Sequence, residues 1–230
     1  MRSSLSLLVL FVASCGSQAT TTITGDAFAF NEGTGSLVAD AHVFVLEDPE
    51  LDATTDAQGH FVIAGVPIGS DATLVLEHPD FIPIQTGTHV VPAAGIDRIT
   101  FQAVRPVIRD ALAQLIDITP DPTRCQMVTT VTRVGRSLYD EGAHGEAGAI
   151  VTITPAVPSE AGPIYFDASV LPDRMLTETS EDGGVLVVNA PVGEYTWTAE
   201  LEGATFTTLR MKCRAGFLVN ASPPWGLQRL

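Results

Sequence analysis

Residues 54–69 (TTDAQGHFVIAGVPIG) and residues 178–193 (ETSEDGGVLVVNAPVG) align without a gap at an offset of 124 residues, and this internal repeat decides the fold. In each copy a glycine, Gly59 or Gly183, precedes a short run of alternating apolar residues that ends in Pro-x-Gly. The glycine permits the positive φ of a tight turn. The alternation is typical of a strand with one buried face, and the proline ends that strand because it cannot donate to a ladder. The chain therefore contains two copies of one β-unit.

The repeat extends upstream, where residues 41–45 (AHVFV) correspond to residues 148–152 (GAIVT) at a shorter offset. The second copy therefore holds about 16 additional residues, around positions 155–170, and such length differences concentrate in surface loops. Elsewhere, short segments rich in β-branched and aromatic residues alternate with Gly, Pro and Asp clusters about every ten residues. This pattern predicts an all-β protein with two tandem antiparallel β-sandwiches.

The strand, the turn and the Pro-x-Gly ending together resemble the carboxypeptidase regulatory-like family of transthyretin-like, or Ig-like, β-sandwiches. The resemblance covers about residues 23–102 and 126–215. It implies a first sandwich over residues 23–103 and a second, with a C-terminal tail, over residues 125–230. It implies little about activity, because this module accompanies many unrelated proteins.

Residues 104–124 are predicted to join the two sandwiches through a short amphipathic helix. Apolar residues recur from Val104 to Ile116 at the spacing i, i+3, i+4, i+7 and i+8, which is one face of a helix. We expect this face to pack on one or both sandwiches. The alternative is a helix that binds a partner or lies on a membrane surface.

The N-terminus predicts the cellular location. Arg2 precedes an apolar run of about eight residues, which is too short to cross a bilayer and is typical of a secretory signal. The small residues before Cys15 resemble the bacterial lipoprotein processing site. The resemblance implies a signal peptide over residues 1–14, lipid on Cys15 and a tether over residues 15–22. An ordinary secretory signal is the alternative.

The lipid on Cys15 would hold the protein to a membrane of the bacterial cell envelope. Gly16 and Ser17 carry no acidic retention signal, so we expect the outer membrane in a Gram-negative host, on its periplasmic or surface face. The other two cysteines, Cys125 and Cys213, are expected to pair, because disulfides persist in exported proteins. They would tie the first and last strands of the second sandwich. Two free thiols are the alternative.

The formal net charge of −15 argues against nucleic acid as a partner. A protein or a glycan remains open as a partner. Residues 47–56 (EDPELDATTD) are expected to concentrate carboxylates in one loop. They form the best calcium candidate, although they lack the regular alternation and central glycine of an EF-hand loop. A solvated acidic face is the alternative interpretation.

No catalytic residue, metal ligand or cofactor is expected. The five histidines lack the spacing of a zinc site, and the serines lack a nucleophile motif. Intradiol dioxygenases resemble this type of sandwich and hold iron with two Tyr and two His. Tyr139, Tyr165 and Tyr195 are present, but the paired histidines are not, so a metal-dependent enzyme is the weakest hypothesis.

The leading hypothesis is a non-catalytic, lipid-anchored envelope protein with a structural, adhesive or accessory binding role. The alternative is a carbohydrate-binding module of the starch-binding type. Such a module needs aromatic rings on one exposed face. The candidates for stacking on a sugar are Trp197 and Trp225, with Tyr165 and Phe166.

Overall fold

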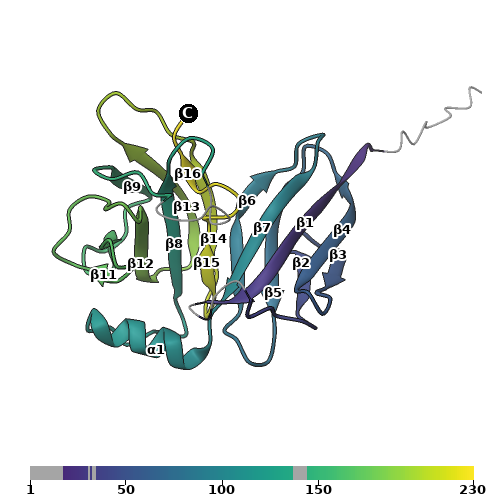
Figure 1. The fold of residues 1–230 in the computed structure, drawn as a ribbon, viewed down its shortest axis with the longest axis horizontal. Helices are drawn as coiled ribbons and strands as arrows, with labels where there is room; N and C mark the ends of the chain where they lie inside the picture. The colour runs from purple at the N-terminus through teal and green to yellow at the C-terminus, as the bar shows by residue number, and fades with distance from the viewer. Residues whose placement is uncertain (1–17, 31, 33–34, 137–143) are drawn as a thin grey trace, which may run out of the picture.

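The computed structural model describes residues 18–30, 32, 35–136 and 144–230, and the fold is all-β apart from one described helix (Figure 1). Two β-sandwiches lie side by side and each has its own buried core. The predicted fold class is therefore confirmed. No helix of these described residues is long and apolar enough to cross a membrane. Cys15 and the predicted signal peptide lie outside the described residues.

The first sandwich contains the strands β1 (Thr20–Ala29), β2 (His42–Val45), β3 (Asp48–Thr54), β4 (His60–Pro67), β5 (Asp71–Glu77), β6 (Ile84–Val90) and β7 (Ile96–Ala103). Sheet β4-β1-β7 forms one layer, and β3-β2-β5-β6 forms the other. Alternate residues of β1 and β4 point into the core between the layers, where the rings of Phe61 and Phe101 lie 5.9 Å apart. This alternation is the one that the repeat predicted.

The second sandwich contains β8 (Cys125–Thr132), β9 (Ile150–Thr154), β10 (Ile164–Phe166), β11 (Pro172–Asp173), β12 (Gly184–Ala190), β13 (Gly193–Glu200), β14 (Leu209–Cys213), β15 (Leu218–Asn220) and β16 (Leu227–Gln228). One layer runs β11-β10-β12-β8, with β15 and β16 both parallel to β8. The other layer is β9-β13-β14. Trp197, Met127 and Met211 are among the largest fully buried side chains between them.

The two copies of the repeat share their turn contacts atom for atom. The Ala41 N–H donates to Thr55 Oγ1 at 2.9 Å, and the Ala149 N–H donates to Thr179 Oγ1 at 2.9 Å. Both threonines are buried, so each hydroxyl satisfies a backbone group that water cannot reach. These contacts also correct the upstream alignment by one residue, because Ala41 matches Ala149 and not Gly148.

Strand β6 joins the two sandwiches. It pairs antiparallel with β5 of its own sandwich, antiparallel with β14 and parallel with β15. Ile84 is registered with Leu218, and Thr88 with Arg210. The sandwiches therefore share backbone pairing and are not separated by a linker alone (Figure 1).

Helix α1 (Pro106–Leu115) lies across the lower end of the second sandwich in Figure 1. Pro106 occupies the first turn, where its missing N–H costs nothing. The expected packing of the whole apolar stripe is wrong in part. Val107 and Leu115 are 67% and 60% exposed, and Ala113 is the only residue of α1 that is buried.

Three local expectations are corrected by tertiary pairing. The acidic residues 48–54 form β3, which pairs with β2, where a loop was expected. Strand β1 begins at Thr20, inside the predicted tether. The C-terminal tail supplies β15 and β16, so β14 is not the last strand of the second sandwich.

Candidate functional site at the junction of the two sandwiches

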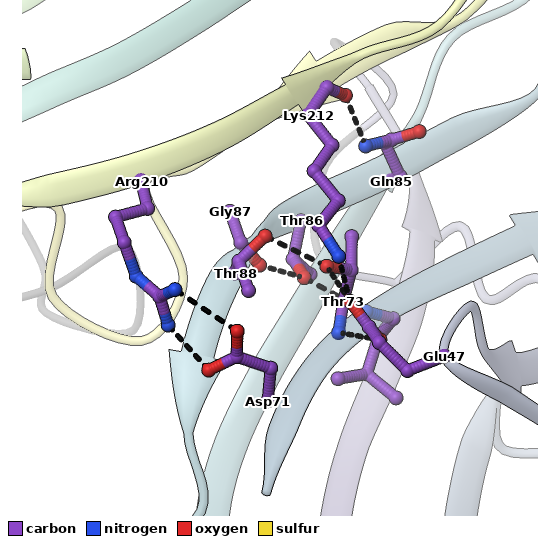
Figure 2. A network of polar contacts seen from close by, with 10 residues as sticks. Glu47, Asp71, Thr73, Gln85, Thr86, Gly87, Thr88, Arg210 and Lys212 are labelled. Atoms are coloured by element: carbon purple, nitrogen blue, oxygen red, sulfur yellow. Dashed lines mark hydrogen bonds and ion pairs between the residues drawn. The ribbon is translucent and has the colours of Figure 1, made fainter. Parts of the chain in front are cut away.

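Two ion pairs cross the junction (Figure 2). Arg210 on β14 donates from Nη1 to Asp71 Oδ2 at 2.9 Å and from Nη2 to Asp71 Oδ1 at 2.5 Å. Lys212 Nζ, two residues further along the same strand, donates to Glu47 Oε1 at 2.7 Å. Residues two apart on a strand point to the same face, so β14 directs both cations at the first sandwich.

The Glu47 carboxylate is also held within its own sandwich. The Thr73 N–H donates to Glu47 Oε2 and the Thr73 hydroxyl to Oε1, each at 2.7 Å. Burial raises the pKa of Glu47, but the hydrogen bonds from Lys212 and Thr73 outweigh it and bring the pKa below its usual 4.5. Glu47 is therefore a fixed carboxylate and not a proton donor near neutral pH.

Buried side chains complete this network. Gln85 is fully buried and donates from Nε2 to the Lys212 carbonyl at 2.7 Å, and the hydroxyls of Thr73 and Thr88 lie 2.8 Å apart. Figure 2 shows these groups facing one another from β5, β6 and β14. These groups bond to one another, except that Gln85 Oε1 is buried without a hydrogen-bond partner among the described residues. The network is suited to holding the sandwiches together.

An apolar cavity of about 290 Å³ lies between α1 and the outer face of the β12-β8-β15 sheet. Both sandwiches line it. Its apolar walls include Phe30, Ile82, Val104, Leu112, Ile116, Val128, Phe166, Leu186, Val188 and Leu218. Ile116, Ile164 and Val188 form a small separate core at the helix end of this cavity.

One end of the cavity is polar. Asp182 and His144 both line it, and Asp182 Oδ2 accepts a hydrogen bond from the Gly184 N–H at 3.0 Å. The pKa of Asp182 lies above its usual 3.8, chiefly because the carboxyl is buried, and Asp167 adds to the rise. The Gly184 hydrogen bond and the nearby His144 oppose it. His144 Nδ1 is buried and has no hydrogen-bond partner in the described part of the chain. The sequence offered no signal for this pair, because the two residues meet only through the fold.

A second hollow, of about 370 Å³, lies on another side of the junction and contains Trp225. Its walls include His89, Asp97, Arg210 and Pro224. The Arg98 guanidinium lies over the Trp225 ring, 5.2 Å from its centroid. The pKa of His89 is lowered from 6.5 to about 4, chiefly by burial and also by the neighbouring Arg210, while Glu47 opposes the shift. His89 is therefore a neutral ring at physiological pH.

The other predicted stacking residues are not available. Trp197 is fully buried in the second core, so the expectation that it stacks on a ligand is wrong. Tyr165 is buried as well, and its hydroxyl oxygen accepts the Val151 N–H at 3.0 Å. Phe166 lines the apolar cavity and not the hollow that contains Trp225. Trp225 is half-buried and is the one ring of the four with a place in that hollow.

The acidic residues do not converge on a metal. Asp52 pairs with His42 at 3.1 Å, and Asp56 accepts the N–H groups of Gln58 and His60 within its own turn. Among the described residues, no three His, Cys, Asp or Glu side chains lie close enough to hold a metal ion. Tyr139, one of the tyrosines considered for iron, lies outside them.

A disulfide joins Cys125 and Cys213, with the Cα atoms 5.6 Å apart, which is the pairing that the sequence predicted. Both residues are buried. Because β8 and β14 belong to opposite layers, the bond ties the two sheets of the second sandwich together.

No family model matches the chain, and no curated protein matches its sequence. Solved structures with loosely similar folds include the TIE protein of Bacillus anthracis, with 12% identity, a TM-score of 0.29 and coverage of 87% of this chain and 33% of that one. This chain thus spans about a third of that protein.

The similarity to two further structures extends over nearly the whole length of those chains. The shaft pilin SpaA from Lactobacillus rhamnosus GG, in a double-mutant form, has 10% identity, a TM-score of 0.28 and coverage of 92% of this chain and 97% of that one. A candidate carbohydrate-binding protein from Bacteroides uniformis has 11% identity, a TM-score of 0.27 and coverage of 84% and 96%. Similarities this low assign no role to any residue of this chain.

Proposed function

We propose that this chain is a non-catalytic, lipid-anchored protein of the bacterial cell envelope with a structural or accessory binding role. The observation that carries the proposal is the junction, where the shared strand β6 and the pairs Arg210–Asp71 and Lys212–Glu47 unite two sandwiches. Fused sandwiches provide an extended, stiff body. The groups at the junction are engaged with each other and are not arranged to act on a substrate.

The proposed anchoring depends on the resemblance of the residues before Cys15 to the lipoprotein processing site, and it is tested at Cys15. We expect Cys15→Ala to abolish incorporation of labelled palmitate and to leave residues 1–14 attached when the gene is expressed in a Gram-negative host. The matched control is the double variant Cys125→Ala/Cys213→Ala, which removes the other two cysteines and should still be labelled. Normal processing before residue 15 in Cys15→Ala would contradict the proposal.

Carbohydrate binding is a second candidate, favoured by Trp225 in the hollow with Asp97. An indole face beside a carboxylate and a guanidinium is suited to stacking on a sugar ring and bonding its hydroxyls. A glycan array probed with the chain from residue 16 should then show binding that Trp225→Ala abolishes. Phe217→Ala is the matched control, because Phe217 also lies beneath an arginine, Arg214 at 3.9 Å, but outside the hollow. Absence of binding by the unmodified chain would remove this candidate.

A further inference from the structure

The outer face of the second sandwich is apolar where a solvent-facing sheet would be polar. On β12 the inward residues Val185 and Val187 belong to the core, yet the outward residues Leu186 and Val188 are apolar too. Val128 on β8 and Leu218 on β15 continue this outward apolar face into the cavity. Strands with two apolar faces are found where both faces are covered. Here α1 covers one end, and the cavity occupies the rest.

The first copy of the repeat shows that this is not a general property of the β-unit. Val62 and Ala64 occupy the positions of Leu186 and Val188, and both are exposed, Val62 by 50%. The outer face of β4 is therefore open to solvent at these two positions. The covered apolar face is therefore particular to the second sandwich, where α1 and the junction enclose it.

Asp182 and His144 lie at the polar end of this cavity, and Thr129, Thr130, Asn220 and Ser222 add hydroxyl and amide groups to its lining. Asp182 offers carboxylate oxygens, and His144 Nδ1 is buried without a partner in the described residues. Arg109 of α1 also lines the cavity, but its guanidinium pairs with Asp110 at 2.7 Å. An anionic group at the Asp182 end would meet a carboxylate at low dielectric, which is unfavourable. A hydroxyl or amine would instead donate a hydrogen bond to the Asp182 carboxylate.

The cavity and the start of β1 lie at opposite ends of that strand. Phe30, at the cavity, follows the last residue of β1, whereas Thr20 begins that strand at its other end. A strand of ten residues spans about 33 Å. The cavity is therefore about one strand length from Thr20.

We propose that this cavity binds a small, uncharged amphipathic molecule, with an apolar body against α1 and β12 and a hydroxyl or amine donor at the Asp182–His144 end. The volume of about 290 Å³ falls at the lower limit for small-molecule sites, which are mostly apolar with a few placed polar groups. The site is independent of lipid anchoring and of the hollow with Trp225. It therefore stands or falls on its own test.

The first test titrates the disulfide-bonded protein with N-phenyl-1-naphthylamine, a neutral apolar fluorophore that has one N–H donor. We expect saturable fluorescence enhancement with one site per chain. Leu186→Trp should fill the cavity and weaken binding by about tenfold or more. Val62→Trp, the same change at the equivalent position of the first copy, should leave it unchanged. Leu112→Trp fills the cavity from the helix side and should also weaken binding, in case Leu186→Trp does not fold.

The second test measures displacement of the bound fluorophore by 1-decanol and by decanoate, which share a chain but differ in head group. We expect the alcohol to displace it at concentrations about tenfold lower, because the carboxylate faces Asp182. Asp182→Asn should shrink that difference. Unsaturable fluorescence, or equal binding by Leu186→Trp, Leu112→Trp and Val62→Trp, would overturn the site. Equal displacement by both competitors would overturn the assignment of its polar end.

Discussion

Arg210 and Asp71 are 139 residues apart in the chain and meet through two hydrogen bonds across the junction of the sandwiches. The geometry is the two-point arrangement in which guanidinium and carboxylate pair best. The hydrogen bonds from Arg210 stabilise the carboxylate form of Asp71, so the pKa of Asp71 lies below its usual 3.8. The side chains are nevertheless 46% and 39% exposed, so water and salt weaken their attraction.

We therefore expect Asp71→Asn and Arg210→Gln to lower the free energy of unfolding by less than about 1 kcal/mol each. Their coupling in a double-mutant cycle should be of the same size and should fall as salt is added. Urea unfolding at low and high ionic strength measures both. A coupling that is larger and does not respond to salt would show that the pair is more shielded from water than its exposure indicates.

Glu47→Ala should be more costly, by about 2 kcal/mol, because it leaves the buried Thr73 N–H without an acceptor and removes the partner of Lys212. The folded-state pKa of Glu47 lies below 4.5, so its contribution to stability is complete above that pH and is lost as the pH falls through the lowered value. Asp52→Ala is the control, since Asp52 makes only an exposed contact with His42. Similar losses for both variants would contradict this account.

We expect protonation of His89 to lower the free energy of unfolding as the pH falls. Its pKa falls from 6.5 to about 4 on folding, so the unfolded chain binds the proton more tightly between these values. Stability from this group is therefore complete above pH 6.5 and is lost toward pH 4, by up to about 3 kcal/mol. His89→Gln should flatten the stability profile over that window, whereas His60→Gln, at an exposed site, should not. An unchanged slope in His89→Gln would refute the assignment.

Removing the disulfide by Cys125→Ala/Cys213→Ala should lower stability by up to about 4.5 kcal/mol, because the bond closes a separation of 88 residues. From sequence alone, only the second sandwich would be expected to respond. Strand β6 pairs with both β14 and β15, so we expect calorimetry to show one transition that shifts as a whole. Two transitions, of which one is unaffected, would show that the sandwiches unfold independently.

The parts of the fold that were predictable are those set by local chemistry. Gly59 and Gly183 take φ of 71° and 75°, and Thr55 and Thr179 cap their turns alike, so the repeat predicted both turns and the strands that follow. The disulfide was predictable because the predicted lipidation of Cys15 left only two cysteines to pair.

The rest depends on partners that are distant in sequence. The acidic residues 48–54 form a strand because β2 pairs with them, although their composition opposes it. Trp197 was a reasonable surface candidate until the alternation of β13 placed it inside. The cavity, which Asp182 and His144 both line, forms where α1 covers the second sandwich, and no local sequence pattern predicts it.

The shared strand β6 also bears on solubility. In an isolated first sandwich, β6 would be a seven-residue edge strand with its unpaired N–H and C=O groups open to any other chain. The second sandwich covers that edge with β14 and β15. Separating the two copies of the repeat would therefore expose a template for edge-to-edge aggregation, and the pair is the smallest unit that we expect to remain monodisperse.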